Sequence, residues 1–218
     1  MFFSLTDYLL FLPAVLVITL MPGPDFAIVV KTALLSGRRP AILCALGVTC
    51  GVAVHTVAAI LGISAVIASS ATLFSVLKWA GAAYLFWLGF QALRASFTKE
   101  KGEAGEEAVH ELIEKAEKQT GRAAFRSGLL CNLLNPKVVI FVLTFFPQFI
   151  DPSLPSGPQL ALLGGTWMVM GLVWLSVLVI LMARIRPVFG RPAFQRWLNR
   201  TMGAILILFG LRLAAAEN

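Results

Sequence analysis

Two short stretches of this chain place charged side chains beside prolines inside long apolar runs. The first, Leu20–Val30, reads LMPGPDFAIVV, and Asp25 directly follows the prolines of a PGP triplet. The second, residues 132–137, reads NLLNPK, and Lys137 directly follows Pro136. A carboxylate can bind an ammonium group or exchange a proton, and an ammonium group can bind a carboxylate. Together the two charges complement those of a zwitterionic amino acid.

The prolines also predict how the backbone presents these charges. Proline has no N–H and clashes with the preceding turn, so it interrupts a helix. The segment after it begins a new helix, whose free N–H groups and partial positive charge attract anions. We therefore predict two broken helices whose new N-termini converge on one polar site. The residues assigned to that site are Pro22, Gly23, Pro24, Asp25, Asn132, Asn135, Pro136 and Lys137.

Two simpler interpretations compete with a binding site. Prolines in membrane helices often produce only a kink, and Asp25 and Lys137 could form a purely structural ion pair. A charged side chain inside a membrane span costs at least about 2.5 kcal/mol, and here two opposite charges both adjoin helix breaks. That coincidence favours a functional site. A pair that opens and closes would serve both roles, as a gate.

Other polar or reactive residues within the apolar runs have weaker patterns. His55 is a candidate proton relay together with Asp25, or else it hydrogen-bonds to a neighbouring helix. The three cysteines lack CxxC spacing and are predicted to be free. No metal and no cofactor is expected. The five tryptophans are interpreted as interface anchors or packing residues: Trp79, Trp87, Trp167, Trp174 and Trp197.

The composition is that of an integral membrane protein. Of the 218 residues 58% are hydrophobic and 13% charged, and the mean hydropathy is +0.84. A soluble domain needs more polar surface, whereas apolar runs of roughly 20 residues can cross a bilayer as helices. We predict an all-α polytopic protein with six transmembrane helices. The predicted spans are Leu5–Leu35, Ala41–Ile67, Leu73–Leu93, Ala124–Ile150, Leu160–Ala183 and Trp197–Ala214.

The distribution of charge predicts the orientation of these spans. Residues 99–122 carry five basic and seven acidic residues, which leaves thirteen basic and four acidic residues elsewhere, a net charge of +9. Basic residues alternate between rich and poor connections, and the rich ones are expected to be cytoplasmic. Both termini are therefore predicted to be extracytoplasmic. The placement at the edges of apolar runs argues against a nucleic-acid partner.

The two halves of the chain show a weak internal similarity. Aligning Pro24 with Pro136 sets Asp25 against Lys137, and, separately, LKWAGA at residues 77–82 resembles LNRTMGA at residues 198–204. Because three spans per half is an odd number, the second half must be inverted, which is a common plan of secondary transporters. We predict a first three-helix repeat over residues 1–95, a charged cytoplasmic loop over residues 96–123, and a second, inverted repeat over residues 124–218.

The distances along the helices place both breaks deep in the bilayer. At 1.5 Å per residue, Asp25 lies about 20 Å from Arg38, and Pro136 lies about 15 Å from Arg126. These arginines should mark the cytoplasmic boundary. Interrupted backbone is tolerated at that depth where it faces protein or a water-filled cavity.

The combination of motifs resembles the LysE/RhtB family of amino-acid exporters, of the homoserine, threonine and lysine efflux type. The resemblance rests on PGPD at residues 22–25, on NLLNPK at residues 132–137 followed by FFPQF, and on the pattern Gly47, Gly51, His55 and Gly62. It implies a six-span protein of the bacterial inner membrane that exports amino acids or close derivatives, driven by the proton gradient. It also implies that the PGPD and NPK residues form the site.

The resulting functional prediction is a secondary transporter and not an enzyme. Its partners would be an amino-acid substrate, protons and membrane lipid, and self-association is left open. One alternative is an exporter or channel for inorganic cations, although these ions need more oxygen ligands than the spans supply. The other is a membrane thiol-redox carrier, which would need paired cysteines on facing helices.

Overall fold

The computed structural model describes residues 5–21, 23–97, 119–189 and 192–215. Two sequence predictions fall partly outside these ranges. One concerns Pro22, and the other concerns most of the charged segment at residues 96–123. The division of the chain into two repeats and a loop therefore remains a prediction.

The described residues are all-helical apart from short connections, as the sequence predicts. The helices are α1 (Leu5–Leu20), α2 (Pro24–Ser36), α3 (Arg38–Ser69), α4 (Ala71–Phe97), α6 (Gly121–Leu133), α7 (Pro136–Phe145), α8 (Ser156–Phe189) and α9 (Pro192–Ala215), with a 3-10 turn η1 (Phe146–Phe149) after α7. Each predicted span corresponds to one long helix or one pair of helices. The two predicted breaks separate α1 from α2 and α6 from α7.

Several of these helices are suited to a bilayer. Within the described residues, two helices are long and apolar enough to span it, at Arg38–Ser64 and Ser156–Met182. The pairs α1–α2 and α6–α7 pass the same test when each pair is taken together, and they bend by 50° and 52° at their breaks. By this criterion there are up to four spans. The prediction of six also needs α4 and α9.

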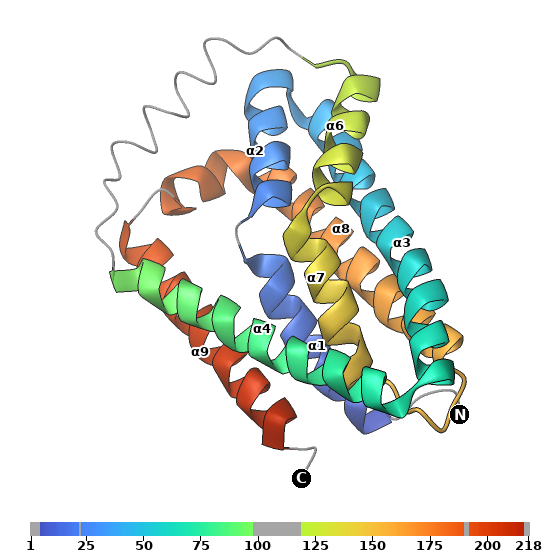
Figure 1. Ribbon diagram of the computed structural model, residues 1–218. Helices are drawn as coiled ribbons and strands as arrows, with labels where there is room; N and C mark the ends of the chain where they lie inside the picture. The colour runs from blue at the N-terminus through green and yellow to red at the C-terminus, as the bar shows by residue number, and fades with distance from the viewer. Residues whose placement is uncertain (1–4, 22, 98–118, 190–191, 216–218) are drawn as a thin grey trace.

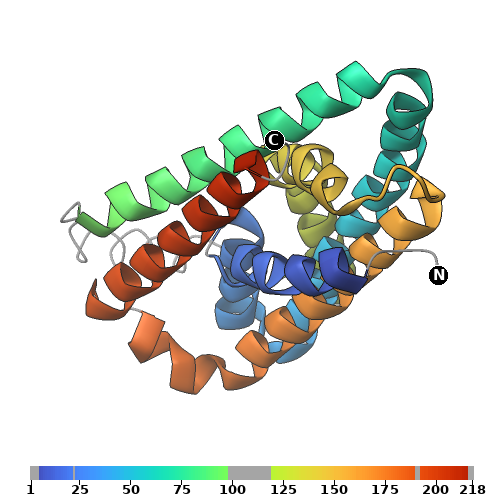
Figure 2. The same cartoon turned by 90° about the horizontal axis from the view of Figure 1, so that it is seen from below.

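The two bent pairs run in opposite directions through the molecule. Figure 1 shows α1 below α2 but α6 above α7. Helix α3 packs mainly on α6 and α8, and α2 packs on α3, α6 and α8. Helices α4 and α9 pack mainly on each other and lie side by side along one side of the molecule (Figures 1 and 2).

Glycines allow α3 and α6 to approach closely. A Cβ atom added at Gly47 would lie 2.9 Å from the Leu129 nitrogen, and one added at Gly128 would lie 3.0 Å from the Cys44 carbonyl carbon. Side chains cannot occupy such positions without moving backbone. The close contact places Asn132, near the end of α6, directly beside α3.

The buried apolar residues form two clusters at different levels of the bundle. The first cluster is rich in aromatic rings from α1, α7, η1 and α8. Its rings pack on one another: Phe141 stacks on Phe145 with centroids 4.3 Å apart, and Phe141 meets Trp167 edge to face with centroids 4.9 Å apart. The second cluster joins α2, α3, α6 and α8 around Val29, Cys44 and Val179. The two helix breaks lie between these clusters.

A compact connection follows η1. Gln159 is buried; its side-chain carbonyl accepts from the Asp151 N–H, and its amide donates to the Asp151 carbonyl oxygen. Ser153 donates from its N–H and its hydroxyl to the Asp151 carboxylate, and these bonds lower the pKa of Asp151. The connection therefore holds the start of α8 against the end of η1.

Candidate functional site

The first break separates α1 from α2, and Gly23 there has an extended backbone. In the last helical hydrogen bond of α1, the Met21 N–H donates to the Val17 carbonyl oxygen. In the first of α2, the Ala27 N–H donates to the Gly23 carbonyl oxygen. Pro24 occupies the first turn of α2, where its missing N–H costs no helical bond. Asp25 follows in the same turn, where the helix N-terminus favours a negative charge.

The second break is held by the side chain of Asn135 and by backbone hydrogen bonds. Asn135 has an extended backbone and caps α7, since its side-chain oxygen accepts from the Lys137 N–H at 3.1 Å. Pro136 starts α7, as Pro24 starts α2. The Asn135 N–H donates to the Asn132 carbonyl at 3.1 Å. The break is thus ordered by local hydrogen bonds, with Asn135 at its centre.

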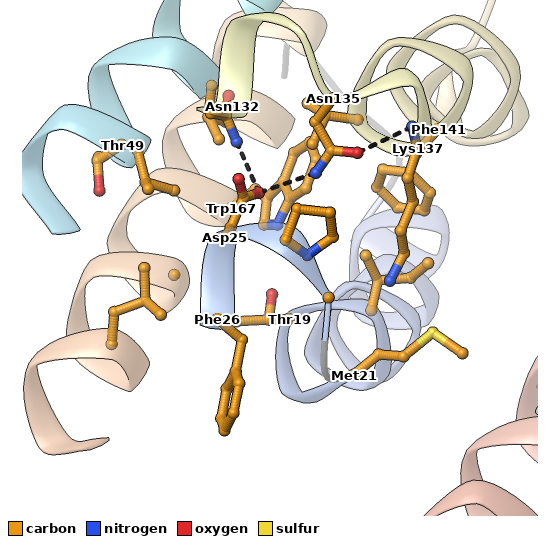
Figure 3. Close-up of a pocket in the computed structure, with 18 of the residues that line it drawn as sticks. Thr19, Met21, Asp25, Phe26, Thr49, Asn132, Asn135, Lys137, Phe141 and Trp167 are labelled. Atoms are coloured by element: carbon orange, nitrogen blue, oxygen red, sulfur yellow. Dashed lines mark hydrogen bonds between the residues drawn. The ribbon is translucent and has the colours of Figure 1, made fainter. Parts of the chain in front are cut away.

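The two breaks meet at Asp25. Its Oδ2 accepts from Asn132 Nδ2 at 2.9 Å and from Asn135 Nδ2 at 3.4 Å, as Figure 3 shows. Asn132 is 0% exposed and Asn135 5% exposed, so both bonds lie inside the protein. Asn135 therefore has two functions. Its oxygen caps α7, and its nitrogen holds the carboxylate of α2.

Two oxygen atoms of this group have no partner. Asp25 Oδ1 and Asn132 Oδ1 are buried, and neither has a hydrogen-bond partner among the residues that the structure describes. Most buried polar atoms in proteins are paired, because leaving one unpaired costs free energy. The unused acceptor capacity at Asp25 is a feature of sites that take up a proton or a cationic group.

Lys137 reaches across from α7 to the first break. Its Nζ would lie 3.8 Å from a Cβ atom added at Gly23. Within the described ranges, no ion pair joins it directly to Asp25, whose Oδ2 is bonded to the two amides instead. The structure therefore places a carboxylate and an ammonium group near one another without pairing them.

His55 contacts this group of residues through a hydrogen bond to Asn132. Its Nε2 is 3.2 Å from the Asn132 carbonyl oxygen, which places the imidazole of α3 against the end of α6. It does not line the pocket described below. The interpretation of His55 as a partner of a neighbouring helix is thus observed, and its predicted role in proton coupling is untested.

A pocket opens beside the two breaks, where the two apolar clusters meet. It includes six of the predicted site residues, whereas Pro136 and His55 are outside its lining and Pro22 lies outside the described residues. Asp25 and Lys137 are the charged members of the lining. Its walls come from α1, α2, α3, α6, α7 and α8: Ile18, Thr19, Met21, Gly23, Pro24, Asp25, Phe26, Val48, Thr49, Val52, Asn132, Asn135, Lys137, Val138, Phe141, Trp167, Met168, Gly171, Trp174 and Leu175.

Sequence reasoning missed the contribution of α8. Trp167 and Trp174 were expected to be interface anchors or packing residues, but both line the pocket. Trp79, Trp87 and Trp197 are exposed, as an anchor at a lipid interface would be. The signal that could have distinguished them is the spacing Trp167, Gly171, Trp174, which puts two indoles and a glycine on one helical face.

Comparison with known proteins identifies the family of this chain. The family model described as "LysE type translocator" matches residues 16–217. The homoserine/homoserine lactone efflux protein of Salmonella typhimurium is 33% identical over 201 residues, covering 92% of each chain. The threonine efflux protein of Escherichia coli K12 is 32% identical over 198 residues, covering 91% of this chain and 92% of that protein. No solved structure matches the chain.

The resemblance predicted from PGPD and NPK is thereby confirmed. The matching region contains both helix breaks and all of the pocket-lining residues. The relatives are named as amino-acid efflux proteins, and the helices of this chain are apolar enough to cross a membrane. The chain belongs to the family of LysE type translocators.

Proposed function

We propose that this translocator exports a zwitterionic amino acid, or a close derivative, from the bacterial cytoplasm in exchange for protons. The observation that carries the proposal is the placement of an acid and an amine, from two oppositely running helix breaks, on one largely apolar pocket. The substrate ammonium group binds at Asp25, and the substrate carboxylate binds at Lys137. Gly23, Pro24, Asn132, Asn135 and Pro136 shape the breaks that hold these two groups.

The hydrogen bonds that the side chains of Asn132 and Asn135 donate to Asp25 support a role in proton exchange. Neutral donors hold the carboxylate in position without cancelling its charge, so it can still bind a cation or a proton. A proton arriving from outside neutralises Asp25 and weakens its hold on the substrate ammonium group. Loss of that proton to the cytoplasm restores the binding site. His55, bonded to the Asn132 carbonyl, is the second residue assigned to proton movement.

The proposed membrane arrangement has six spans in two inverted repeats. Each bent pair counts as one span, α3 and α8 supply two more, and α4 and α9 supply the last two. Both breaks then lie near the middle of the inner membrane. The ends of the bundle that carry Arg38 and Arg126 face the cytoplasm, and both chain termini lie outside.

Export of an inorganic cation draws less support from the same pocket. A resident lysine repels a cation, and one carboxylate with two asparagines supplies few oxygen ligands for a hard metal ion. An amino acid uses both charges of the pocket. The names of the relatives, which refer to homoserine and threonine, point to the same class of substrate.

The decisive test of the proposal is transport into everted membrane vesicles that are acidified inside. We expect vesicles with the wild-type protein to accumulate L-homoserine or L-threonine. We expect Asp25→Asn to abolish the accumulation that depends on the pH gradient. Asp151→Asn, which changes a partly exposed acid in the connection between η1 and α8, is the matched control. Membrane content of each variant is measured by immunoblot. Gradient-driven transport by Asp25→Asn would remove the acid from the mechanism.

The assignment of Lys137 can be tested with a substrate that lacks a carboxylate. Lys137→Met should lower transport of L-homoserine about tenfold or more, because the carboxylate loses its charged partner. Transport of L-homoserine lactone, in which that carboxylate is an ester, should fall much less. Equal losses for both compounds would show that Lys137 does not bind the substrate carboxylate.

A further inference from the structure

One face of α8 forms a continuous wall of the pocket. Trp167, Met168, Gly171, Trp174 and Leu175 all line it, at the i, i+1, i+4, i+7 and i+8 spacing of a single helical face. Gly171 lies at the centre of this face. Each tryptophan lies about one turn away from it, on opposite sides, so the glycine leaves a gap between two indoles.

Gly171 differs from the glycines that allow helices to pack. A Cβ atom added at Gly164 on the same helix would lie 2.8 Å from Thr56 Cβ, so Gly164 is needed for the contact with α3. Apart from its chain neighbours and the adjoining backbone of α8, no residue that the structure describes would come within 4 Å of a Cβ atom added at Gly171. No neighbouring helix requires the glycine. What its missing side chain does provide is open space at the wall of the pocket.

The chemistry around this space limits what can occupy it. The other members of the α8 face are apolar or aromatic, and the charged members of the pocket lining, Asp25 and Lys137, are already assigned to the backbone groups of the substrate. The indole N–H of Trp174 is buried, and it has no acceptor within the part of the chain that the structure describes. The space therefore suits an uncharged group that offers an oxygen acceptor.

We propose that the space over Gly171, between Trp167 and Trp174, is the subsite for the side chain of the transported amino acid. Gly171 limits the size of that side chain, and the Trp174 N–H donates to its oxygen. The preferred substrate then has a short, uncharged side chain with a hydroxyl or carbonyl group, and a basic amino acid is rejected. This inference rests on the proposed function, because it assumes that Asp25 and Lys137 bind the amino and carboxylate groups.

The test compares L-alanine, L-2-aminobutyrate, L-homoserine and L-lysine as substrates in acidified everted vesicles. L-2-aminobutyrate is L-homoserine without its hydroxyl group. We expect wild type to prefer L-homoserine to L-2-aminobutyrate about tenfold and to reject L-lysine. Gly171→Ala should lower transport of L-homoserine relative to L-alanine about tenfold. Trp174→Phe should remove the preference for the hydroxyl compound.

Gly165→Ala is the matched control. Gly165 lies on the same helix, outside the pocket lining, and a Cβ atom added there would also have no neighbour within 4 Å. The rates at which Gly165→Ala transports the four amino acids, relative to one another, should equal those of wild type. Gly171→Ala should reach the membrane in wild-type amounts, and failure to do so would make Gly171 a packing residue and overturn the proposal.

The outcomes separate this inference from the function on which it rests. If wild type carries none of the four amino acids, the proposed function fails and the subsite fails with it. If wild type carries them but Gly171→Ala lowers all of them equally, or L-lysine is carried as well as L-homoserine, the subsite alone is wrong. Unchanged ratios in both Gly171→Ala and Trp174→Phe would also overturn it.

Discussion

Asp25 shows how a carboxylate can lie inside an apolar bundle and still be available for binding. The side-chain amides of Asn132 and Asn135 donate to it, and it lies in the first turn of α2; both features stabilise the negative charge without neutralising it. A direct ion pair between Asp25 and Lys137 would have neutralised both charges and left less charge available to bind a ligand. The proposed function therefore depends on the separation of the Asp25 carboxylate from the Lys137 ammonium group.

A glycine on α3 controls this arrangement from outside the pocket. The Asn132 side chain packs directly on Gly51, so that a Cβ atom added there would lie 2.7 Å from Asn132 Cβ and 2.8 Å from its Cγ. No side chain at residue 51 can coexist with this rotamer of Asn132. Gly51 is thus a positioning residue for the amide that holds Asp25.

Gly51→Ala should therefore impair transport without preventing insertion. Because Asn132 must move away from Asp25, we expect the rate of L-homoserine transport to fall about tenfold or more, the effect of losing a hydrogen bond to a charged group. Gly62→Ala on the same helix is the control, since a Cβ atom added there has no neighbour within 4 Å. Transport at the wild-type rate by Gly51→Ala, with normal membrane content, would contradict the positioning role.

At the scale of helices, the positions of the two breaks depend on packing against α3. Helices α2 and α6 both pack on α3, and the contact between α3 and α6 has carbonyl groups facing glycines. Close approach of this kind is a common means of helix association in membranes, where apolar burial between helices contributes little. Helix α3 therefore acts as the fixed element against which the ends of α2 and α6 are positioned.

Gly128→Ala tests the strength of this contact. The added methyl group would meet the Cys44 carbonyl carbon at 3.0 Å and its Sγ at 3.1 Å, and backbone cannot yield as a flexible side chain can. We expect a loss of about 1–3 kcal/mol in stability, as found for overpacked interiors. It would be measured as a lower midpoint of thermal unfolding in detergent. Gly157→Ala, whose Cβ would lie an ordinary 3.8 Å from Ile60, should unfold as wild type does; equal midpoints for the two variants would refute the prediction.

At the scale of the whole molecule, the pocket lies between two differently built ends. Toward η1 it is bordered by the aromatic rings of Phe141 and Trp167, and Phe145 packs on Phe141. Toward the other end it is bordered by the smaller aliphatic residues of the second cluster, such as Val48 and Leu175. Alternating access would have to separate one of these clusters at a time, and the two breaks are the points at which the helices already bend.

The orientation of the whole molecule can be tested with reporter fusions. Because basic residues concentrate in alternate connections, we expect a C-terminal alkaline phosphatase fusion to be active and a C-terminal GFP fusion to be dark. A reporter inserted in the charged segment at residues 98–118 should give the opposite pattern. A fluorescent C-terminal GFP fusion would contradict the placement of that terminus outside the cytoplasm.

The amino-acid sequence by itself determined the helical class, the approximate extent of each long helix, the two breaks, the charged residues beside them and the family. Hydropathy and the geometry of proline act over a few neighbouring residues, so a linear pattern is enough to predict their effects. The capping role of Asn135 is local for the same reason. The span count and the repeat plan remain predictions.

The tertiary structure alone decided which side chains meet. The hydrogen bonds from Asn132 and Asn135 to Asp25 and the contact of Asn132 with Gly51 join residues that are distant in sequence, and the pocket brings the α8 face around Gly171 together with them. They depend on how each helix is rotated about its axis and how closely it approaches its neighbour. In a chain that is apolar on nearly every helical face, no periodic pattern records that rotation.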